Sequence, residues 1–232
     1  MRIEGATALV TGANRGLGKA FVEELLARGA TKVYATARDV STITDPRVTP
    51  LELDITEPAS VAAAARAAAD VDLVVNNAGI ATGASVLGDE NDLRRELETN
   101  FFGPVRVTRA FAPVLAANGG GAVVNVLSVL SWLALPSTGG YSAAKAAAWA
   151  ATNAQRQELA GQGTHVVGVH VGYLDTEMAA HIDGPKTSPD KLAAQVLDAV
   201  EAGEPEVLGD DTSRNVKAAL SGDLRDLYGS RG

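Results

Sequence analysis

The sequence contains no cysteine and only three histidines among its 232 residues. Without cysteine there is no disulfide framework, no thiolate ligand for a metal and no cysteine nucleophile. The histidines His165, His170 and His181 show no metal-ligand spacing. We therefore predict no metal site, and we interpret His165 and His170 as residues of a strand.

The sequence also lacks long apolar runs and an excess of positive charge. No uninterrupted apolar run reaches the roughly 20 residues of a membrane-spanning helix. The net charge of −8 argues against a general affinity for nucleic acid or anionic membranes. Because the first predicted strand begins at residue 6, we expect no signal or transit peptide and a cytoplasmic location.

Short apolar runs alternate with segments of helical spacing along the whole chain, and 46% of the residues are hydrophobic. Strands are predicted over residues 6–10, 32–36, 48–53, 72–76, 121–127, 165–171 and 206–208. Helices are predicted over 19–28, 57–69, 89–117 (interrupted or kinked by Pro104 and Pro113), 142–159 and 189–201, with a polar, helix-like tail over about 211–228. This alternation predicts an α/β fold with one parallel sheet between layers of helices, in a single domain over residues 1–232.

A glycine-rich turn follows the first strand, with glycines at positions 12, 16 and 18. Glycines let the backbone approach a pyrophosphate, and the free amides of a helix N-terminus complement its charge. The spacing G-x-x-x-G-x-G differs from the commoner G-x-G-x-x-G. The segment favours a dinucleotide-phosphate site, and the alternative is a glycine-rich turn without a ligand.

Tyr141 and Lys145 are separated by one turn of a predicted helix, so their side chains share a face. A cation beside the phenol stabilises the phenolate and is expected to lower the tyrosine pKa from about 10 toward neutrality. Such a pair can serve as a general acid/base at a carbonyl oxygen. In isolation, however, the same spacing also describes two surface neighbours.

Four further motifs accompany this pair: Asp54 after an apolar strand, Asn-Asn-Ala-Gly at 76–79, Asn100, and Ser128 thirteen residues before Tyr141. With the glycine turn, they resemble the short-chain dehydrogenase/reductase (SDR) family over about residues 6–178. The resemblance implies a three-layer, doubly wound parallel sheet (Rossmann fold) and hydride transfer to or from a nicotinamide.

By this resemblance, Tyr141 is the acid/base and Ser128, rather than its neighbour Ser131, holds the substrate oxygen. Lys145 would bind the nicotinamide ribose and tune Tyr141, and Asn100 would position a water of a proton relay. The implied cofactor-binding residues are Gly12, Asn14, Arg15, Gly16, Leu17, Gly18, Arg38, Asp54, Ile55, Asn77, Ala78, Gly79, Tyr141, Lys145, Leu174 and Thr176. Asp54 could instead cap a helix or form a turn.

The end of the second strand bears on the choice of cofactor. By alignment with the family, Ala37 occupies the position where NAD-preferring relatives carry an acid, and Arg38 follows. Arg38 and Arg15 could together hold a 2′-phosphate, although both could equally be solvated. Asp39 could pair with Arg38 or reach the ribose. We predict NADP(H), with NAD(H) as the less favoured cofactor.

Apolar residues of the loops after the fourth, fifth and sixth strands are expected to wall a substrate cleft. The predicted substrate-binding residues are Ser128, Trp132, Leu135, Tyr141, Tyr173 and Met178, and a short lid is predicted over about 173–190. This wall favours a medium-sized, largely apolar aldehyde or ketone. The lid also departs from the family pattern, because Val171 precedes Gly172 where proline is usual.

The predicted protein is thus an NADPH-dependent carbonyl reductase or alcohol dehydrogenase. A catalytically silent NADP-binding redox sensor is the alternative, and an epimerase or dehydratase would need a larger C-terminal substrate domain. The family resemblance implies an interface of paired helices across a two-fold axis, and the alanine-rich segment 146–151 suits such close packing, although it would equally suit packing against its own sheet. We expect a homodimer, with a monomer as runner-up, because the tail over 211–228 could block a second interface.

Overall fold

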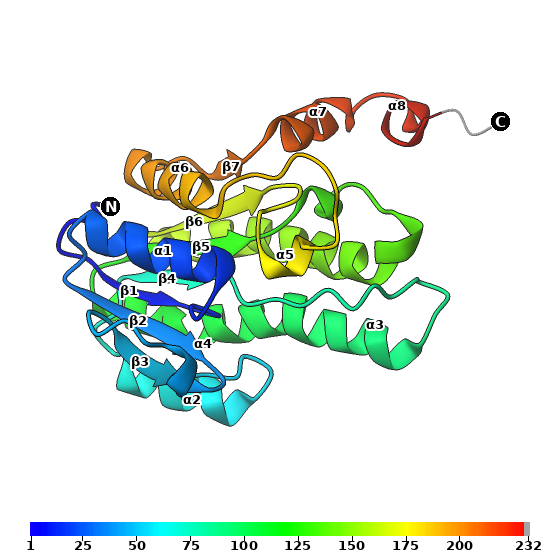
Figure 1. Ribbon diagram of the computed structural model, residues 1–232. Helices are drawn as coiled ribbons and strands as arrows, with labels where there is room; N and C mark the ends of the chain where they lie inside the picture. Colours follow the sequence, from blue (N-terminus) through cyan, green and yellow to red (C-terminus); the bar gives the residue numbers. More distant parts are fainter. Residues whose placement is uncertain (230–232) are drawn as a thin grey trace.

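The computed structural model describes residues 1–229. Its strands form one parallel sheet in the order β3-β2-β1-β4-β5-β6-β7 (Figure 1). They are β1 (Thr7–Val10), β2 (Lys32–Ala37), β3 (Thr49–Glu52), β4 (Leu73–Asn76), β5 (Gly121–Val126), β6 (Thr164–His170) and β7 (Glu206–Leu208). Every predicted strand is present, and each of its ends lies within one residue of the prediction. The strand order changes direction between β1 and β4, which is where a doubly wound sheet binds its ligands.

Helices cover both faces of the sheet and give the three predicted layers (Figure 1). They are α1 (Gly16–Ala27), α2 (Pro58–Ala67), α3 (Glu90–Leu97), α4 (Gly103–Ala117), α5 (Gly139–Glu158), α6 (Pro189–Ala202), α7 (Asp211–Ala219) and α8 (Leu224–Tyr228). On one face, Phe21 of α1 and Leu197 of α6 are fully buried in one hydrophobic cluster. On the other, Phe111 of α4 belongs to a second cluster. Burying a side chain of this size stabilises the fold by about 1.5–3 kcal/mol.

The long helical stretch predicted over 89–117 is interrupted, but not by its prolines. A π-helical turn over Glu98–Phe102 separates α3 from α4. Pro104 lies in the first turn of α4, where no helical N–H is needed, and Pro113 is accommodated inside that helix. An interruption was predicted, but its position was only approximately correct. The widened turn lies before Pro104 and contains Asn100.

Helix α5 begins at Gly139, three residues before the predicted start at residue 142, so Tyr141 lies in its first turn. The two glycines that open the helix are closely packed. A Cβ at Gly139 would lie 2.4 Å from Val86 Cγ2, and one at Gly140 would lie 2.4 Å from Glu96 Oε2. The loop after β4 therefore rests directly on the N-terminus of α5.

The C-terminal tail is helical, as predicted, and α7 and α8 lie at the opposite edge of the molecule from β3 (Figure 1). The predicted lid is a loop that returns on itself, because Thr187 N donates to Tyr173 O at 2.8 Å and Asp175 N donates to Thr187 O at 3.0 Å. Within residues 1–229, no helix is both long and apolar enough to cross a membrane.

Candidate functional site

The carboxyl ends of β1 and β4 are joined by Thr11, a residue to which sequence reasoning gave no function. Its buried Oγ1 accepts hydrogen bonds from Asn77 N and Ala78 N, both at 2.9 Å, and donates to Val75 O at 3.3 Å. A small hydroxyl directly after a buried strand was the available signal. Thr11 thereby fixes the Asn-Asn-Ala-Gly turn beside the glycine turn.

The glycine turn between β1 and α1 leaves no room for side chains at its glycines. Gly12 and Gly16 adopt positive φ angles of 63° and 52°, which favour glycine. A Cβ at Gly18 would lie 2.1 Å from Gly12 O and 2.7 Å from Asn77 Nδ2. Helix α1 starts within the turn, and the side chain of its N-cap residue, Arg15, makes no capping hydrogen bond. The first amides of α1 are therefore suited to an anion such as a pyrophosphate, which fits a dinucleotide.

The two arginines predicted near the ribose differ in their surroundings. Arg15 is exposed and pairs with Glu177 of the lid at 2.8 Å. Arg38 lies exposed at the end of β2. Asp39 is not paired with Arg38; its Oδ1 accepts from Ser41 N at 3.0 Å and from Ser41 Oγ at 2.7 Å, and a contact with the ribose stays a prediction. That carboxylate caps the short turn after β2, which leaves the Arg38 side chain available at the nucleotide edge.

Asp54 adopts the turn role that was considered as the alternative. Its Oδ1 accepts from Thr56 N at 2.9 Å and from Thr56 Oγ1 at 2.7 Å. Burial opposes its ionisation, but the Thr56 hydrogen bonds and the charge of Arg38 outweigh this and lower the pKa of the carboxyl. Ile55 is buried, and its side chain fills the space that a Cβ on Gly103 would need. A contact of Asp54 with an adenine ring stays a prediction.

Lys145 is nearly buried and faces the interior of the site. Its Nζ donates to Val126 O at 2.7 Å and lies 5.5 Å from the centroid of the Tyr141 ring. Burial lowers the pKa of Lys145 to about 8, because an ammonium loses hydration there. Tyrosine and lysine therefore lie together as predicted, and the ammonium has protons left for another acceptor.

The expected direction of the Tyr141 pKa was wrong for this structure. Burial raises the pKa of Tyr141 to about 12; the Ser128 side chain opposes this rise, and the negative charge of Glu96 adds to it. The nearby ammonium does not outweigh burial. Tyr141 is therefore a phenol at neutral pH here, which is the form that donates a proton.

Ser128 is oriented by a short helical turn over Val129–Ser131 that follows β5. Its Oγ accepts from Leu130 N at 3.1 Å, and the Ser131 Oγ accepts from Ser128 N at 3.3 Å. Ser131 is thereby used within the turn. The Ser128 hydroxyl makes a long contact with Val171 O, at 3.5 Å, and its other acceptor is the Tyr141 side chain, whose pKa it lowers. Ser128 can consequently donate to a substrate oxygen, which agrees with its preference over Ser131.

Asn100 is buried, and its side chain is held by the loop after β4. Its Oδ1 accepts from Ile80 N at 3.0 Å, and its Nδ2 donates to Ile80 O at 2.9 Å. A Cβ on Gly79 would lie 2.8 Å from Asn100 Oδ1 and 3.9 Å from Lys145 Nζ, so these residues converge. Because the widened turn interrupts the regular helical ladder at Asn100, the backbone there is suited to bind water.

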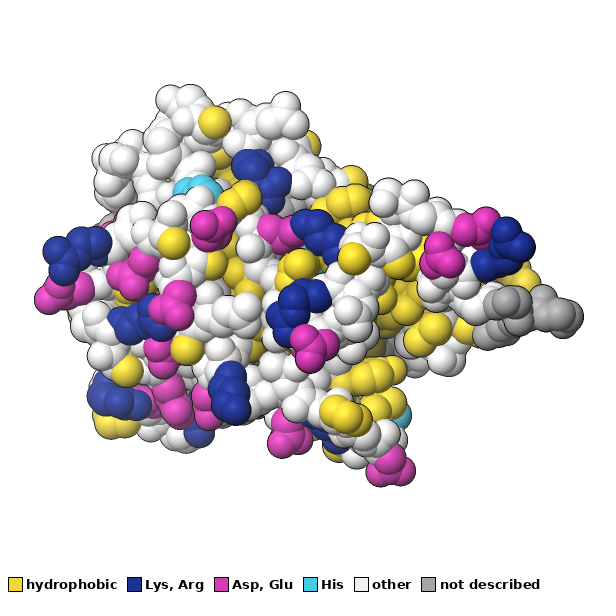
Figure 2. All heavy atoms as spheres, turned by 90° about the horizontal axis from the view of Figure 1, so that it is seen from above, with side chains coloured by type: hydrophobic (Ala, Val, Ile, Leu, Met, Phe, Trp, Pro, Cys, Tyr) yellow, Lys and Arg dark blue, Asp and Glu magenta, His cyan; other side chains and the backbone are white. Residues whose placement is uncertain are grey.

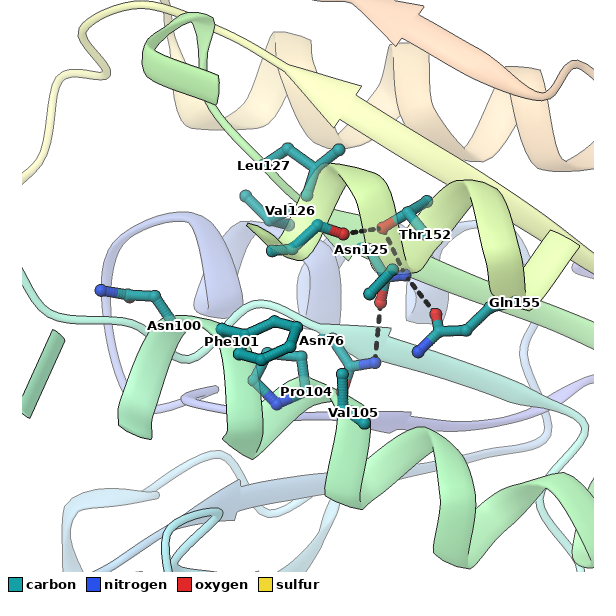
Figure 3. A pocket seen from close by; sticks show the side chains of 12 residues that line it. Asn76, Asn100, Phe101, Pro104, Val105, Asn125, Val126, Leu127, Thr152 and Gln155 are labelled. Atoms are coloured by element: carbon teal, nitrogen blue, oxygen red, sulfur yellow. Dashed lines mark hydrogen bonds between the residues drawn. The ribbon is translucent and has the colours of Figure 1, made fainter. Parts of the chain in front are cut away.

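Behind Asn100 lies a cavity of about 10 Å³, close to the roughly 10–15 Å³ that one water molecule needs. Figure 3 shows a polar ladder on its wall, with the Asn100 side chain pointing away from it. Asn76 Nδ2 donates to Asn125 Oδ1 at 2.9 Å, and Asn125 Nδ2 donates to Thr152 Oγ1 at 3.0 Å and Gln155 Oε1 at 2.9 Å. The ladder ties β4, β5 and α5 together beneath the site.

The lid brings Thr176 to the glycine turn, since a Cβ on Gly16 would lie 3.2 Å from Thr176 Cγ2. Tyr173 and Met178 are 44% and 52% exposed on the lid, and Leu174 forms its bridge to Thr187. At the entrance of the lid, Gly172 N donates to Asp210 Oδ2 at 2.7 Å. A carboxylate of the tail therefore holds the backbone at the point where this chain departs from the family pattern.

Of the remaining predicted substrate residues, Leu135 precedes a short turn over Pro136–Thr138. Trp132 makes contacts that the sequence did not predict. Its ring stacks on His170 with centroids 3.7 Å apart and meets Trp149 edge-on at 6.0 Å. One face of Trp132 is therefore occupied by protein, and its contact with substrate stays a prediction.

Glu96 is a site residue that sequence reasoning missed. It is fully buried in α3, where its Oε1 accepts from Thr82 N at 2.7 Å and Thr82 Oγ1 at 2.8 Å. Its Oε2 is buried without a hydrogen-bond partner beside Gly140. Its position within a strongly charged helical segment gave no signal of burial.

Across residues 1–229, no group of three metal-ligating side chains occurs.

Comparisons with known proteins agree with this geometry. Residues 6–186 match the family described as short chain dehydrogenase. A short chain dehydrogenase from Burkholderia cenocepacia, solved in complex with NADP, superposes with a TM-score of 0.94 at 44% identity over 98% of both chains.

Two curated relatives are similar in sequence. The 3-oxoacyl-[acyl-carrier-protein] reductase FabG of Vibrio cholerae is 33% identical, over 95% of this chain and 90% of that protein. Oxidoreductase calM of Penicillium decumbens is 36% identical over 60% of this chain, and the match spans about half (51%) of its length.

Proposed function

The chain belongs to the short-chain dehydrogenase/reductase family of oxidoreductases, which act on CH–OH and C=O groups, and we propose that it is an NADP(H)-dependent carbonyl reductase or alcohol dehydrogenase. The single observation that carries the proposal is the convergence of a phenol, a hydroxyl that hydrogen-bonds to that phenol and a buried ammonium. These are Tyr141, Ser128 and Lys145. Their arrangement suits a carbonyl oxygen that develops negative charge.

The bound nicotinamide supplies or accepts a hydride. In the reductive direction, Ser128 donates a hydrogen bond to the carbonyl oxygen, and Tyr141 transfers its proton to that oxygen as charge develops. The Lys145 ammonium stabilises the resulting tyrosinate and has protons available for the nicotinamide ribose. The backbone at Asn100 positions water that returns a proton to the site. The phenol pKa of about 12 keeps Tyr141 protonated at neutral pH, so the proton is present when the carbonyl binds.

Two observations support NADP(H) as the cofactor. Arg38 is exposed at the end of β2, where a 2′-phosphate would lie, while Asp39 is engaged with Ser41. The similar Burkholderia protein was solved with NADP. Kinetics with both cofactors test this, and a kcat/KM higher for NADH than for NADPH would overturn it.

The proposed substrate is a medium-sized, largely apolar aldehyde or ketone, supported by the exposed apolar side chains of Tyr173 and Met178 on the lid. The similarity to FabG makes a 3-oxoacyl thioester the competing substrate class. A panel of aldehydes, ketones and 3-oxoacyl thioesters, assayed by NADPH oxidation, separates them. Activity confined to thioesters would refute the apolar-carbonyl proposal.

Tyr141→Phe tests the mechanism, because it keeps the ring and removes the proton. We expect kcat to fall by at least about a hundredfold, the lower end of general-acid contributions, with little change in NADPH affinity. Tyr34→Phe, which also removes a tyrosine hydroxyl but one that bonds to Asp70 from β2, is the control and should retain activity. Near wild-type turnover of Tyr141→Phe would show that the acid/base is another group.

A catalytically silent NADP-binding sensor is the second candidate, and it predicts NADPH binding without turnover on any substrate.

A homodimer is also proposed, with α4 and α5 of each copy facing one another, because small residues line α5. Trp149, a possible anchor, already contacts Trp132 of its own chain. Light scattering at micromolar concentration tests the assembly, and a mass near four chains would refute it.

On the face shown in Figure 2, Lys and Arg side chains lie beside Asp and Glu side chains, with hydrophobic groups between them. Among the exposed ion pairs of the described residues are Arg15 with Glu177 and Arg214 with Asp211. A surface of alternating charge is suited to solubility rather than to a polyanion, which supports a small-molecule substrate. A cytoplasmic location stays a prediction.

A further inference from the structure

His170 is fully buried at the end of β6, and its imidazole reaches the backbone of Ser128. Its Nδ1 lies 3.0 Å from the Ser128 carbonyl oxygen. Because a carbonyl oxygen can only accept, Nδ1 must carry the proton, which defines the tautomer of a neutral ring. The same carbonyl also accepts from Ser131 N at 3.0 Å, inside its own turn. The His170 bond therefore ties that turn to β6.

The imidazole is fixed on its other sides as well. Trp132 stacks on the ring, with an interplanar angle of 16°. The second nitrogen, Nε2, is buried without a hydrogen-bond partner and lies 3.7 Å from Glu206 Oε1, and Glu206 forms an ion pair with Lys217 of α7. Burial lowers the pKa of His170 to about 4, the Ser128 bond opposes this, and the Lys217 charge adds to it. The ring is therefore neutral near pH 7.

The orientation of the Ser128 hydroxyl depends on this backbone. Its Oγ is held by Leu130 N within the turn, and the turn meets β6 through Val129 N, which donates to Val171 O at 2.9 Å. Without the imidazole, the peptide plane after Ser128 would lose one of its two bonds to β6. A rotation of that plane would move the hydroxyl relative to Tyr141.

We propose that His170 is a positioning residue, which fixes the direction of the Ser128 hydroxyl by donating its Nδ1–H to the Ser128 carbonyl oxygen. The proposal rests on the proposed function, because it requires Ser128 to hold the substrate oxygen. Helix α7 contributes to the surroundings of the imidazole, since its Lys217 forms an ion pair with Glu206 of β7, the residue that faces Nε2. Besides the stacking on Trp132 and the Glu206 carboxylate 3.7 Å from Nε2, the Nδ1–H is the group of the ring that hydrogen-bonds to the protein, so this donor carries the effect.

A double-mutant cycle on kcat tests the proposal, with NADPH and an active carbonyl substrate from the panel. The variants are Ser128→Ala, His170→Phe and the double variant; phenylalanine keeps a flat ring against Trp132 and removes the donor. We expect His170→Phe to lower kcat about tenfold, as loss of one hydrogen bond predicts, with NADPH affinity unchanged. In the Ser128→Ala background, the same change should cost almost nothing further, because the two residues act as one unit.

A matched pair covers the possibility that His170→Phe does not fold. Asparagine and leucine have nearly the same shape, but Asn Nδ2 can replace the His170 Nδ1 donor. We expect His170→Asn to retain a higher kcat than His170→Leu at equal NADPH affinity. Equal kcat values for the pair, or a full tenfold loss in both Ser128 backgrounds, would overturn the positioning role. If Ser128→Ala alone has no effect, the proposed function of Ser128 has failed, and the positioning role fails with it.

Discussion

Gly18→Ala is the substitution for which the structure predicts the sharpest steric consequence. A Cβ at this position would lie 2.1 Å from Gly12 O and 2.7 Å from Asn77 Nδ2. The first distance is far inside van der Waals contact, and its partner is backbone that cannot rotate away. Asn77 Nδ2 also donates to Gly12 O at 3.2 Å, so any relief must open the junction between the glycine turn and the loop after β4.

The loss of stability caused by Gly18→Ala can be estimated from known substitutions. Overpacking a well-packed interior costs about 1–3 kcal/mol, and we expect the upper half of this range because the clash is with backbone. In a protein of this size, each 1 kcal/mol lowers Tm by about 2–4 °C, so a fall of about 4–12 °C follows. Displacing the turn also moves the amides that face the cofactor, so NADPH affinity should fall at least about tenfold, a loss of about 1.4 kcal/mol.

Gly161→Ala is the matched control. It adds the same methyl group at a glycine where nothing lies within 4 Å, and its stability should change by less than about 0.5 kcal/mol. Thermal unfolding and NADPH titration by fluorescence should be measured on both variants. If Gly18→Ala matches Gly161→Ala in Tm and in NADPH affinity, the packing argument and the placement of the cofactor on this turn are refuted.

Three further outcomes are expected. Glu96→Gln removes the negative charge that helps to raise the pKa of Tyr141, so half-maximal alcohol oxidation should shift to lower pH, and an unchanged or upward shift would contradict this. Arg38→Ser should raise KM for NADPH about tenfold or more and leave KM for NADH unchanged, because only NADPH carries the 2′-phosphate to which Arg38 would bond. Equal effects on both KM values would exclude that contact. The folded-state pKa of His170, about 4, lies below its ordinary value of 6.5. The unfolded chain therefore binds a proton that the folded protein does not, and the free energy of unfolding should decline as pH falls from 6.5 to 4. If the same decline persists in His170→Phe, other groups cause it.

The sequence was sufficient to predict most of the fold, because apolar runs and helical spacing are local signals. All seven strands and the catalytic helix were predicted on that basis. The widened turn over Glu98–Phe102 was not, since proline rules marked Pro104 instead. That turn depends on how the segment packs against α5 and the loop after β4, and local propensity carries no information on such packing.

The site was predictable to the extent that its residues belong to short motifs at strand ends. Tyr141, Lys145 and Ser128 converge as expected, because parallel topology gathers the carboxyl ends of strands at one edge. The pKa of Tyr141 was not predictable, because two effects of opposite sign compete there. One turn of helix indicates the nearby cation, but the burial that outweighs it exists only in the folded structure.

Glu96 and His170, two of the residues whose roles the sequence missed, share a physical feature that Thr11 lacks. Each is fully buried, each leaves one polar atom without a hydrogen-bond partner, and each has its bonded partner on another element. Leaving such an atom unpaired costs about 1–3 kcal/mol, so a fold gains no stability by keeping it. Glu96 lies beside Tyr141, and His170 holds Ser128. The unpaired Glu96 Oε2 therefore lies beside the first turn of the helix that carries Tyr141, and the His170 ring uses its other nitrogen to hold the backbone of Ser128. Orientation and charge at the two groups proposed to meet the substrate oxygen, rather than stability, explain the presence of these buried side chains.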